Sequence, residues 1–206
     1  MKKSIILTFI AVLCLPGYQA NGQVAPTPFD LSPLLIGETV PDGNLVDAKG
    51  NVVSFYSLIA EKPTIVIFYR GDWCPNCITH FNTEITPNLQ AISDLGYRLI
   101  AISPDAPEKL ISTSGKTKID PSVFFGDCDV SLSKAFGIAH KHGEFMKDVI
   151  IQASGGKNTG PDLPVPAVIV IGTDRKIIFE YINPNVPQSA FRMKWKLLQP
   201  VLVALK

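Results

Sequence analysis

The chain has 206 residues, with 19 Lys and Arg against 18 Asp and Glu, and a formal net charge of +1 at pH 7. A charge so close to balance argues against a nucleic-acid partner and against strong attraction to an anionic membrane. Hydrophobic residues make up 46% of the chain, so a buried core is expected. The length suits one domain rather than two.

The first residues have the pattern of a secretory signal peptide. Lys2 and Lys3 precede an apolar run over residues 5–15, and small and polar residues follow. This run is shorter than the roughly 18 residues of a membrane span. We therefore predict cleavage after Gly22, which removes residues 1–22 together with Cys14, and export to the periplasm or, alternatively, to the medium. No stable membrane insertion is expected after cleavage.

The remaining chain divides into a Pro-rich linker over residues 23–33 and one folded domain over residues 34–206. At the start of the domain, residues 45–55 predict a short hairpin, because Gly50 and Asn51 supply turn chemistry between strand-like residues. Residues 64–69, "TIVIFY", form a continuous β-branched and aromatic run, which is typical of a strand buried on both faces.

Apolar residues then recur at steps of three and four from Cys74 to about Asp94, which predicts a helix kinked at Pro87 and ended by Gly96. Further strands are expected at residues 97–103 and 122–126, with helices at 106–116 and 130–137. A closing hairpin is expected over residues 167–182 and a terminal helix over 188–205. Strands that alternate with helices in this order predict an α/β sandwich with a central mixed sheet.

Cys74 and Cys77 stand where the predicted central strand turns into a helix. The first turn of a helix has unsatisfied N–H groups and a positive partial charge, which stabilise a thiolate there. Three uses of the pair are open: a zinc clip, a structural disulfide and a redox pair. Zinc would need more paired ligands than the sequence offers, and a bridge over so short a loop stabilises little. Redox chemistry is favoured, without a metal or another cofactor.

Five segments carry a family resemblance, in this order: "LLIGETVPDGNLVDAKGNVVSF", "FYRGDWCPNC", "AISPD", "GDCDVSLSKAFGI" and "LPVPAVIVIGTDRKIIFEYINPN". Together they resemble the alkyl hydroperoxide reductase and thiol-specific antioxidant superfamily, the peroxiredoxin-like branch of the thioredoxin fold. The likeness runs from about Leu34 to near the C-terminus. It implies a thioredoxin-like three-layer sandwich, in which helices flank a central mixed β-sheet and a β-hairpin extends the N-terminus.

The resemblance departs from the peroxiredoxin pattern at the site itself. Peroxiredoxins carry Pro, three residues, Thr or Ser, two residues and the peroxidatic Cys. On this sequence that spacing places Arg70 at the Pro, Cys74 at the Thr and Cys77 at the peroxidatic Cys. Thioredoxins instead carry W-C-x-x-C with a nucleophilic first cysteine, here Cys74 behind Trp73, and a facing cis-proline, for which Pro166 is the candidate.

A peroxidase needs a thiolate that attacks one oxygen and fixed donors for the departing one, and a guanidinium suits that role. Arg70, at the end of the strand, is the candidate donor, and the alternative is a solvated charge at the strand end. In this interpretation Cys77 becomes a sulfenic acid and Cys74 condenses with it into a disulfide, which a thioredoxin-type donor reduces. Because a thiol replaces the usual threonine hydroxyl, we expect slower turnover than in a dedicated peroxidase.

The sequence thus predicts an exported thiol peroxidase for hydrogen peroxide or organic hydroperoxides. Two other functions remain open: thiol–disulfide exchange led by Cys74, and a non-catalytic binding protein on the same fold. Trp73, Pro75 and Pro166 are expected to support the site. Cys128 is either a resolving thiol or an unpaired loop thiol. The histidines are predicted to be surface residues, namely His80, His140 and His142.

Overall fold

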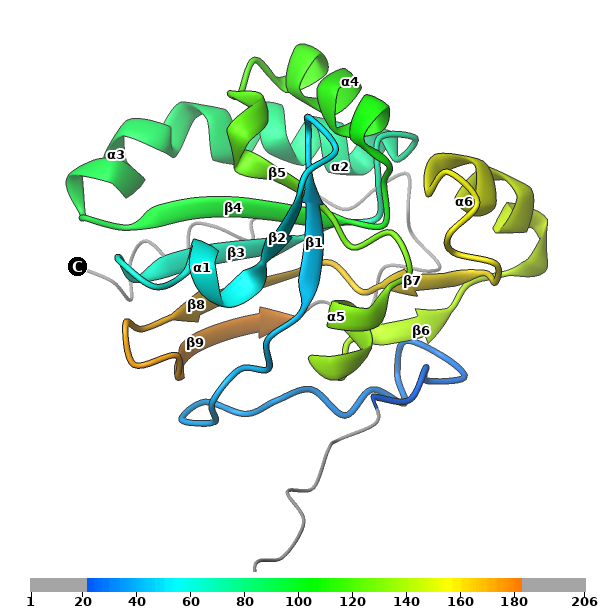
Figure 1. The fold of residues 1–206 in the computed structure, drawn as a ribbon, viewed down its shortest axis with the longest axis horizontal. Coiled ribbons are helices and arrows are strands. Elements are labelled where there is room, and N and C mark those ends of the chain that lie inside the picture. Colours follow the sequence, from blue (N-terminus) through cyan, green and yellow to red (C-terminus); the bar gives the residue numbers. More distant parts are fainter. Residues whose placement is uncertain (1–21, 183–206) are drawn as a thin grey trace, which may run out of the picture.

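The computed structural model describes residues 22–182. Seven strands form one sheet in the order β2-β1-β5-β4-β3-β8-β9 (Figure 1). Their bounds are β1 Asn44–Asp47, β2 Val52–Ser54, β3 Thr64–Phe68, β4 Arg98–Ser103, β5 Phe124–Gly126, β8 Ala167–Ile171 and β9 Ile177–Ile182. Strands β3, β4 and β5 run parallel, whereas β1, β2, β8 and β9 pair antiparallel with their neighbours. The sheet is therefore mixed, as predicted.

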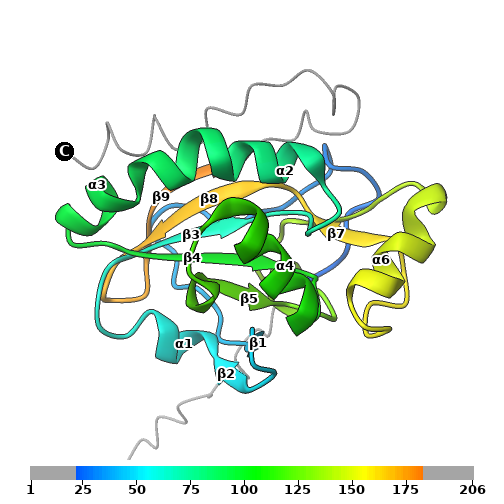
Figure 2. The ribbon, with the colours of Figure 1, turned by 90° about the horizontal axis from the view of Figure 1, so that it is seen from above.

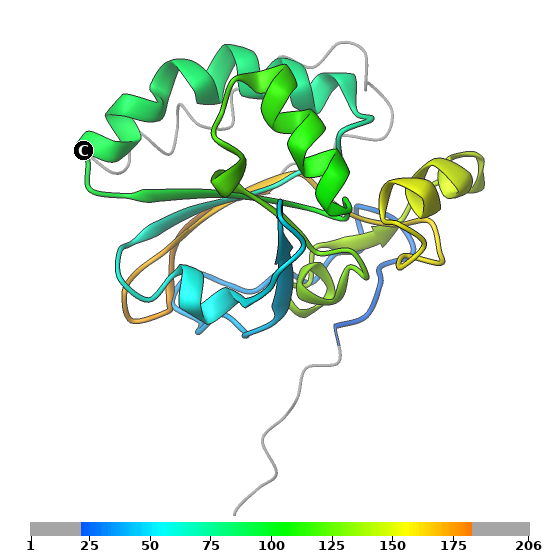
Figure 3. The same cartoon turned by 45° about the horizontal axis from the view of Figure 1, so that its top comes forward.

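Helices cover both faces of this sheet. On one face lie α2 (Pro75–His80), α3 (Leu89–Asp94) and α4 (Pro107–Thr117), which lie over the sheet in Figure 2. On the other face lie α1 (Phe55–Leu58) and α5 (Ser131–Ala135), as Figure 3 shows. The three layers and the hairpin β1–β2 confirm the thioredoxin-like sandwich that the sequence predicted.

Alternate residues of β3 pack into two hydrophobic clusters, one on each face. Ile65 and Ile67 share a cluster with side chains from α2, α3 and α4. Val66 and Phe68 share the other with residues of α1 and α5. All five residues of β3 are buried, which confirms the prediction of a strand covered on both sides. Each large apolar side chain buried in this way contributes about 1.5–3 kcal/mol, so the end of β3 is a rigid base for the cysteines.

The helix predicted over residues 74–94 is interrupted twice. After α2 the chain makes a π-helical turn over Phe81–Ile85 and a 3-10 turn over Thr86–Asn88, and then continues as α3. Pro87 lies in the 3-10 turn, because proline cannot donate the backbone hydrogen bond of a regular helix. The sequence predicted this kink but not the π-helical turn before it.

A small subdomain between α5 and β8 was not predicted from the sequence. It contains β6 (Ala139–Lys141), paired antiparallel with β7 (Asp162–Pro164), and between them a 3-10 turn at Glu144–Met146 and α6 (Lys147–Ala153). Ala25 forms a parallel bridge with His140, so the segment before the domain contacts β6. Three-residue strands are too short to show a period.

Two predictions fall outside the described residues: the signal peptide and the terminal helix. Among residues 22–182, no helix combines the length and the apolar character that a membrane crossing requires.

Candidate active site

The two cysteines lie at the N-terminus of α2, directly after the loop that leaves β3. Cys74 is the N-cap residue, and its Sγ accepts a hydrogen bond from the backbone N–H of Cys77 at 3.3 Å. Pro75 occupies the first helical turn, where its missing N–H costs nothing and its fixed φ suits the helix. The N-cap position aims free N–H groups of the helix at Cys74 Sγ, which favours an anion on this sulfur.

Arg70 places its charge against the same sulfur. Its Nη2 donates a hydrogen bond to Cys74 Sγ at 3.2 Å. The guanidinium carbon lies 5.5 Å from the centroid of the Trp73 ring, within range of a cation–π contact. Arg70 is only 6% exposed, so its charge acts on the thiols with little screening by solvent. It is not a solvated charge at the strand end.

The two thiols differ in acidity. Hydrogen bonding from the Cys77 thiol, the Arg70 charge and the Cys77 amide lower the pKa of Cys74 to about 6, although burial opposes them. Burial raises the pKa of Cys77 well above its usual value, and its hydrogen bond to Cys74 adds to this effect. The pair therefore consists of a Cys74 thiolate and a Cys77 thiol near neutral pH. Both are free thiols in this structure.

Access to the pair is restricted. Cys74 is 0% exposed and Cys77 is 2% exposed. A small oxidant needs less local motion to reach the sulfur than a protein disulfide does, because the latter needs an open groove for its backbone. A cavity of about 100 Å³ lies beside Trp73, between the loop and α6, and is lined by Asp72, Trp73, Lys109, Val149, Gln152 and Ala153.

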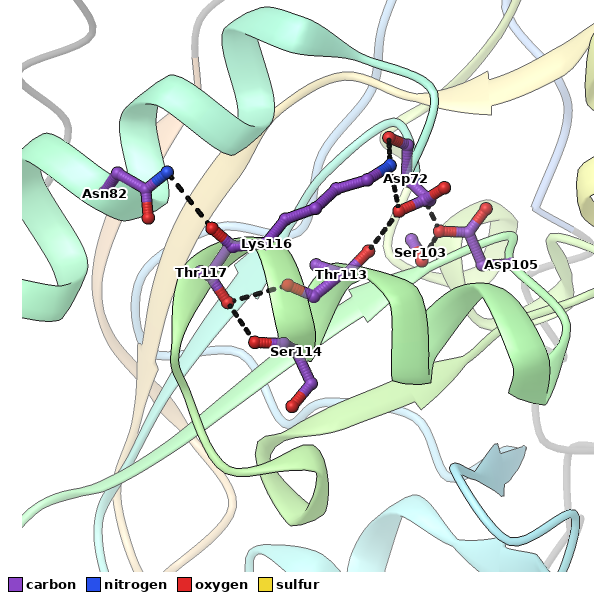
Figure 4. A network of polar contacts seen from close by, with 8 residues as sticks. All are labelled: Asp72, Asn82, Ser103, Asp105, Thr113, Ser114, Lys116 and Thr117. Carbon is purple, nitrogen blue, oxygen red and sulfur yellow. Dashed lines mark hydrogen bonds and ion pairs between the residues drawn. The ribbon is translucent and has the colours of Figure 1, made fainter.

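The loop before Cys74 is tied to the neighbouring elements through Asp72 (Figure 4). The Asp72 amide donates to Asp105 Oδ2 at 2.8 Å, and Asp105 follows the end of β4. The Asp72 carboxylate accepts from Lys116 Nζ at 2.7 Å and from Thr113 Oγ1 at 3.3 Å, both on α4. Strand β4 and helix α4 thus hold the loop from two sides.

Sequence reasoning did not assign a role to Asp72 or Asp105. A signal was available, because the carboxyl ends of neighbouring parallel strands meet at one edge of a sheet. Strand β4 is parallel to β3 and adjacent to it, so the segment "AISPD" at the end of β4 had to lie beside the cysteine loop. The quoted motif already contained Asp105.

Cys128 lies in the loop between β5 and α5 and is buried. Its Sγ donates to the backbone oxygen of Asp105 at 3.3 Å. Burial raises its pKa to about 11, so it is protonated and a poor nucleophile near neutral pH. Its predicted role as a resolving thiol stays a prediction.

The histidines differ from the prediction of surface residues. His80 is 4% exposed and His140 is 5% exposed, so that prediction is wrong for both. Burial lowers the pKa of His140 to about 4 and also lowers the pKa of His142, and the Arg70 charge acts in the same direction on both. Neither the position of His80 relative to the apolar face of its helix nor the two-residue spacing of His140 and His142 indicates burial. The burial of His80 and His140 comes from tertiary contacts, which the local sequence does not show.

Pro166 lies one residue before β8, and Ala167 pairs with Phe68 at the end of β3. Pro166 therefore precedes the strand that pairs with the end of β3, and its supporting role stays a prediction. No peptide bond within residues 22–182 is cis, so the expected cis-proline is not present. In the same part of the chain, no three His, Cys, Asp or Glu side chains gather as a metal site would require.

Comparison of the sequence with known proteins identifies the family of this chain. The chain matches the family described as AhpC/TSA over residues 36–180. It is 26% identical over 108 residues to a protein of Haemophilus influenzae provisionally named peroxiredoxin bcp, across 52% of this chain and 68% of that protein. A provisionally named peroxiredoxin of Mycobacterium tuberculosis is 36% identical over 74 residues, 36% of this chain and less than half (46%) of the relative.

Solved structures share the fold. Reduced Prx3 of Vibrio vulnificus in complex with H2O2 superposes with a TM-score of 0.66 at 14% identity, over 84% of this chain and 99% of that one. A cysteine-to-serine mutant of PrxQ from Xylella fastidiosa gives 0.62 at 18% identity, over 84% and 96%. The fold, the cysteines at the strand–helix junction and the match over most of the domain lead to one conclusion: this chain is a peroxiredoxin-like member of the AhpC/TSA family.

Proposed function

We propose that the protein is an exported thiol peroxidase that reduces hydrogen peroxide or organic hydroperoxides with Cys74 and Cys77 and is recycled by a thioredoxin-type donor. The observation that carries this proposal is the buried hydrogen bond from Arg70 to Cys74 Sγ. It joins a nucleophile to a fixed cation inside the protein. Export is supported by the sequence of residues 1–22, and the reductant by the family relationship.

The first step uses Cys74 as the nucleophile. Its thiolate attacks the outer oxygen of the hydroperoxide, a sulfur–oxygen bond forms and the oxygen–oxygen bond breaks. Cys74 becomes a sulfenic acid, and the departing alkoxide or hydroxide takes a proton and leaves as alcohol or water. Arg70 stabilises the thiolate before the attack and the negative oxygen during it.

The second step uses Cys77. Once Cys74 is a neutral sulfenic acid, the Cys74 charge that raised the pKa of Cys77 is gone. Cys77 loses its proton, its sulfur attacks the Cys74 sulfenic sulfur, a disulfide forms, and the hydroxyl leaves with that proton as water. A dithiol donor then transfers two electrons by thiol–disulfide exchange and restores both thiols. The thiol acidities favour this order over the one suggested by motif spacing, in which Cys77 attacks first, because a thiolate and not a thiol is the nucleophile.

Thiol–disulfide exchange is the second candidate, and one observation favours it. A first cysteine with a lowered pKa followed by a second with a raised pKa is the asymmetry that an exchange enzyme needs. The burial of Cys74 counts against it, since a protein substrate must reach the sulfur.

The two functions are separated by mixing the reduced protein with hydrogen peroxide, with cumene hydroperoxide and with a model protein disulfide in separate stopped-flow runs. A peroxidase consumes either peroxide much faster than a free thiol does and reduces the protein disulfide slowly. The reverse pattern would assign the exchange function.

A further inference from the structure

Behind the cysteine loop lies a buried carboxyl group that takes no part in the proposed reaction steps. Asp105 is 0% exposed. Its Oδ2 accepts two hydrogen bonds, from the Asp72 amide at 2.8 Å and from Ser103 Oγ at 2.9 Å (Figure 4). Its Oδ1 is buried and makes no hydrogen bond within the described chain. A buried carboxyl in this state is costly, so its presence needs a reason.

The backbone of the loop is fitted closely around this carboxyl. Gly71 has φ +135, a conformation that other residues rarely adopt. A β-carbon on Gly71 would lie 2.8 Å from Asp105 Oδ1 and 2.8 Å from Trp73 Nε1. Only a glycine lets the loop approach the carboxyl so closely.

The same loop leads directly to the reactive sulfur. The Gly71 carbonyl accepts the Cys74 amide at 3.1 Å, so a shift of residues 71–73 moves the N-cap residue. Arg70, on the other side of Gly71, supplies the contact to Cys74 Sγ. The path of this loop therefore sets the distance between the guanidinium and the thiolate.

Three side chains anchor Asp72: Lys116 and Thr113 bind its carboxylate, and Asp105 binds its backbone amide. The Thr113 contact is long, at 3.3 Å. The Lys116 side chain is 44% exposed, so its ion pair with Asp72 contributes little to holding the loop. The Asp72 amide is bound by a buried carboxyl, and loss of that acceptor would leave the amide donor unsatisfied. Asp105 is accordingly the strongest anchor.

We propose that Asp105 is a positioning residue of the redox site, which accepts the Asp72 amide and thereby holds the loop that presents Cys74 to Arg70. The proposal rests on the proposed role of Cys74 as the reacting thiol. It assigns no contact between Asp105 and the peroxide. Asp105→Ala should let the loop relax away from the Arg70–Cys74 geometry, whereas Asp105→Asn keeps a side-chain oxygen for the Asp72 amide.

The test measures the alkylation rate of Cys74 by iodoacetamide, followed by peptide mass spectrometry, in the reduced full chain from pH 5 to 9. In Asp105→Ala we expect the midpoint of the pH profile to rise by about one pH unit, which makes alkylation at pH 5 about tenfold slower. In Asp105→Asn the midpoint should stay close to that of the wild type. The matched control is Asp127→Ala, because Asp127 is also buried and also accepts backbone amides, but at the start of α5.

The proposal is overturned if folded Asp105→Ala keeps the wild-type midpoint, or if Asp105→Asn and Asp127→Ala shift it as far as Asp105→Ala does. Should Asp105→Ala fail to fold in circular dichroism, Asp105→Ser gives the same comparison, because its shorter side chain does not reach the Asp72 amide. Alkylation involves no peroxide. A protein without peroxidase activity would therefore refute the proposed function and leave this test intact.

Discussion

Arg70 and Cys74 are four residues apart, yet they meet inside the protein, with Nη2 3.2 Å from Sγ. The turn at Gly71 brings the end of a buried strand and the cap of a helix together. Because the helix N-terminus and the guanidinium both stabilise an anion on the same sulfur, the pair forms a prepared thiolate. The following predictions depend on this contact and on the loop that maintains it.

Removing the guanidinium should slow the reaction with peroxide. We expect Arg70→Ala to lower the second-order rate constant by about a hundredfold, as the loss of one fixed donor to a developing oxyanion does elsewhere. Stopped-flow fluorescence of Trp73, in a chain with Trp195 replaced by Phe, measures this rate. Arg175→Ala is the control, because Arg175 also stacks on an aromatic ring, that of Tyr56 at 4.1 Å, away from the cysteines. Equal rates in Arg70→Ala and Arg175→Ala would contradict the proposed role.

The pH dependence of the reaction should follow the Cys74 thiol. Its pKa of about 6 means that Cys74 is protonated as the pH falls through 6. Above pH 7 almost all of Cys74 is thiolate. The rate with hydrogen peroxide should therefore rise from pH 5 and level off near pH 7. In Arg70→Ala the midpoint should move upward, because the stabilising charge is gone. A midpoint near 8.5 in the wild type, roughly the value of an ordinary thiol, would contradict this account.

Asp105 should make the folded protein less stable as the pH rises. Burial raises its pKa to about 7, although the hydrogen bonds from the Asp72 amide and from Ser103 oppose this rise. The folded state therefore holds this proton more tightly than the unfolded state does, and the stability it gives is complete below about pH 4 and lost as the pH rises through 7. The full effect is at most about 4 kcal/mol.

Urea unfolding of the wild type and of Asp105→Asn at several pH values checks this prediction. The variant should lose less free energy of unfolding between pH 4 and pH 8 than the wild type does. Identical pH dependence in the two proteins would show that Asp105 titrates normally.

Gly71 should tolerate substitution poorly. Gly71→Ala combines a strained φ of +135 with contacts at 2.8 Å to Asp105 and Trp73, and we expect a loss of about 2–3 kcal/mol in the free energy of unfolding. Gly50→Ala separates the two causes, because Gly50 has φ +87 but nothing within 4 Å of its β-carbon position. That control should lose about 1 kcal/mol. Equal losses would mean that the crowding at Gly71 is relieved by local movement.

Much of the fold was predictable from local patterns. The buried strand at residues 64–69, the hairpin at 45–55 and the parallel strand at 97–103 each showed their period or their turn residues. The subdomain with β6, β7 and α6 was not, because its strands have three residues each and are defined by pairing with distant segments. Local sequence contains no trace of such pairing.

The sequence indicated which residues form the candidate site better than it indicated the role of each residue. The spacing of Cys74 and Cys77 at a strand–helix junction identified the thiols, and Arg70 was chosen for its chemistry. Which thiol is acidic depends on the N-cap geometry and on the direction of the guanidinium, which are tertiary features. The burial of His80 and His140 and the contact of Asp105 with the loop likewise require the packed structure.

The most direct test of the central claim, that Cys74 attacks the peroxide, is to locate the sulfenic acid. Cys77→Ser and Cys74→Ser are treated with one equivalent of hydrogen peroxide in the presence of dimedone, and the labelled peptide is identified by mass spectrometry. We expect rapid labelling of Cys74 in Cys77→Ser, and at most slow labelling in Cys74→Ser. Rapid labelling of Cys77 in Cys74→Ser, with Cys74 unlabelled in Cys77→Ser, would contradict the claim and assign the attack to Cys77.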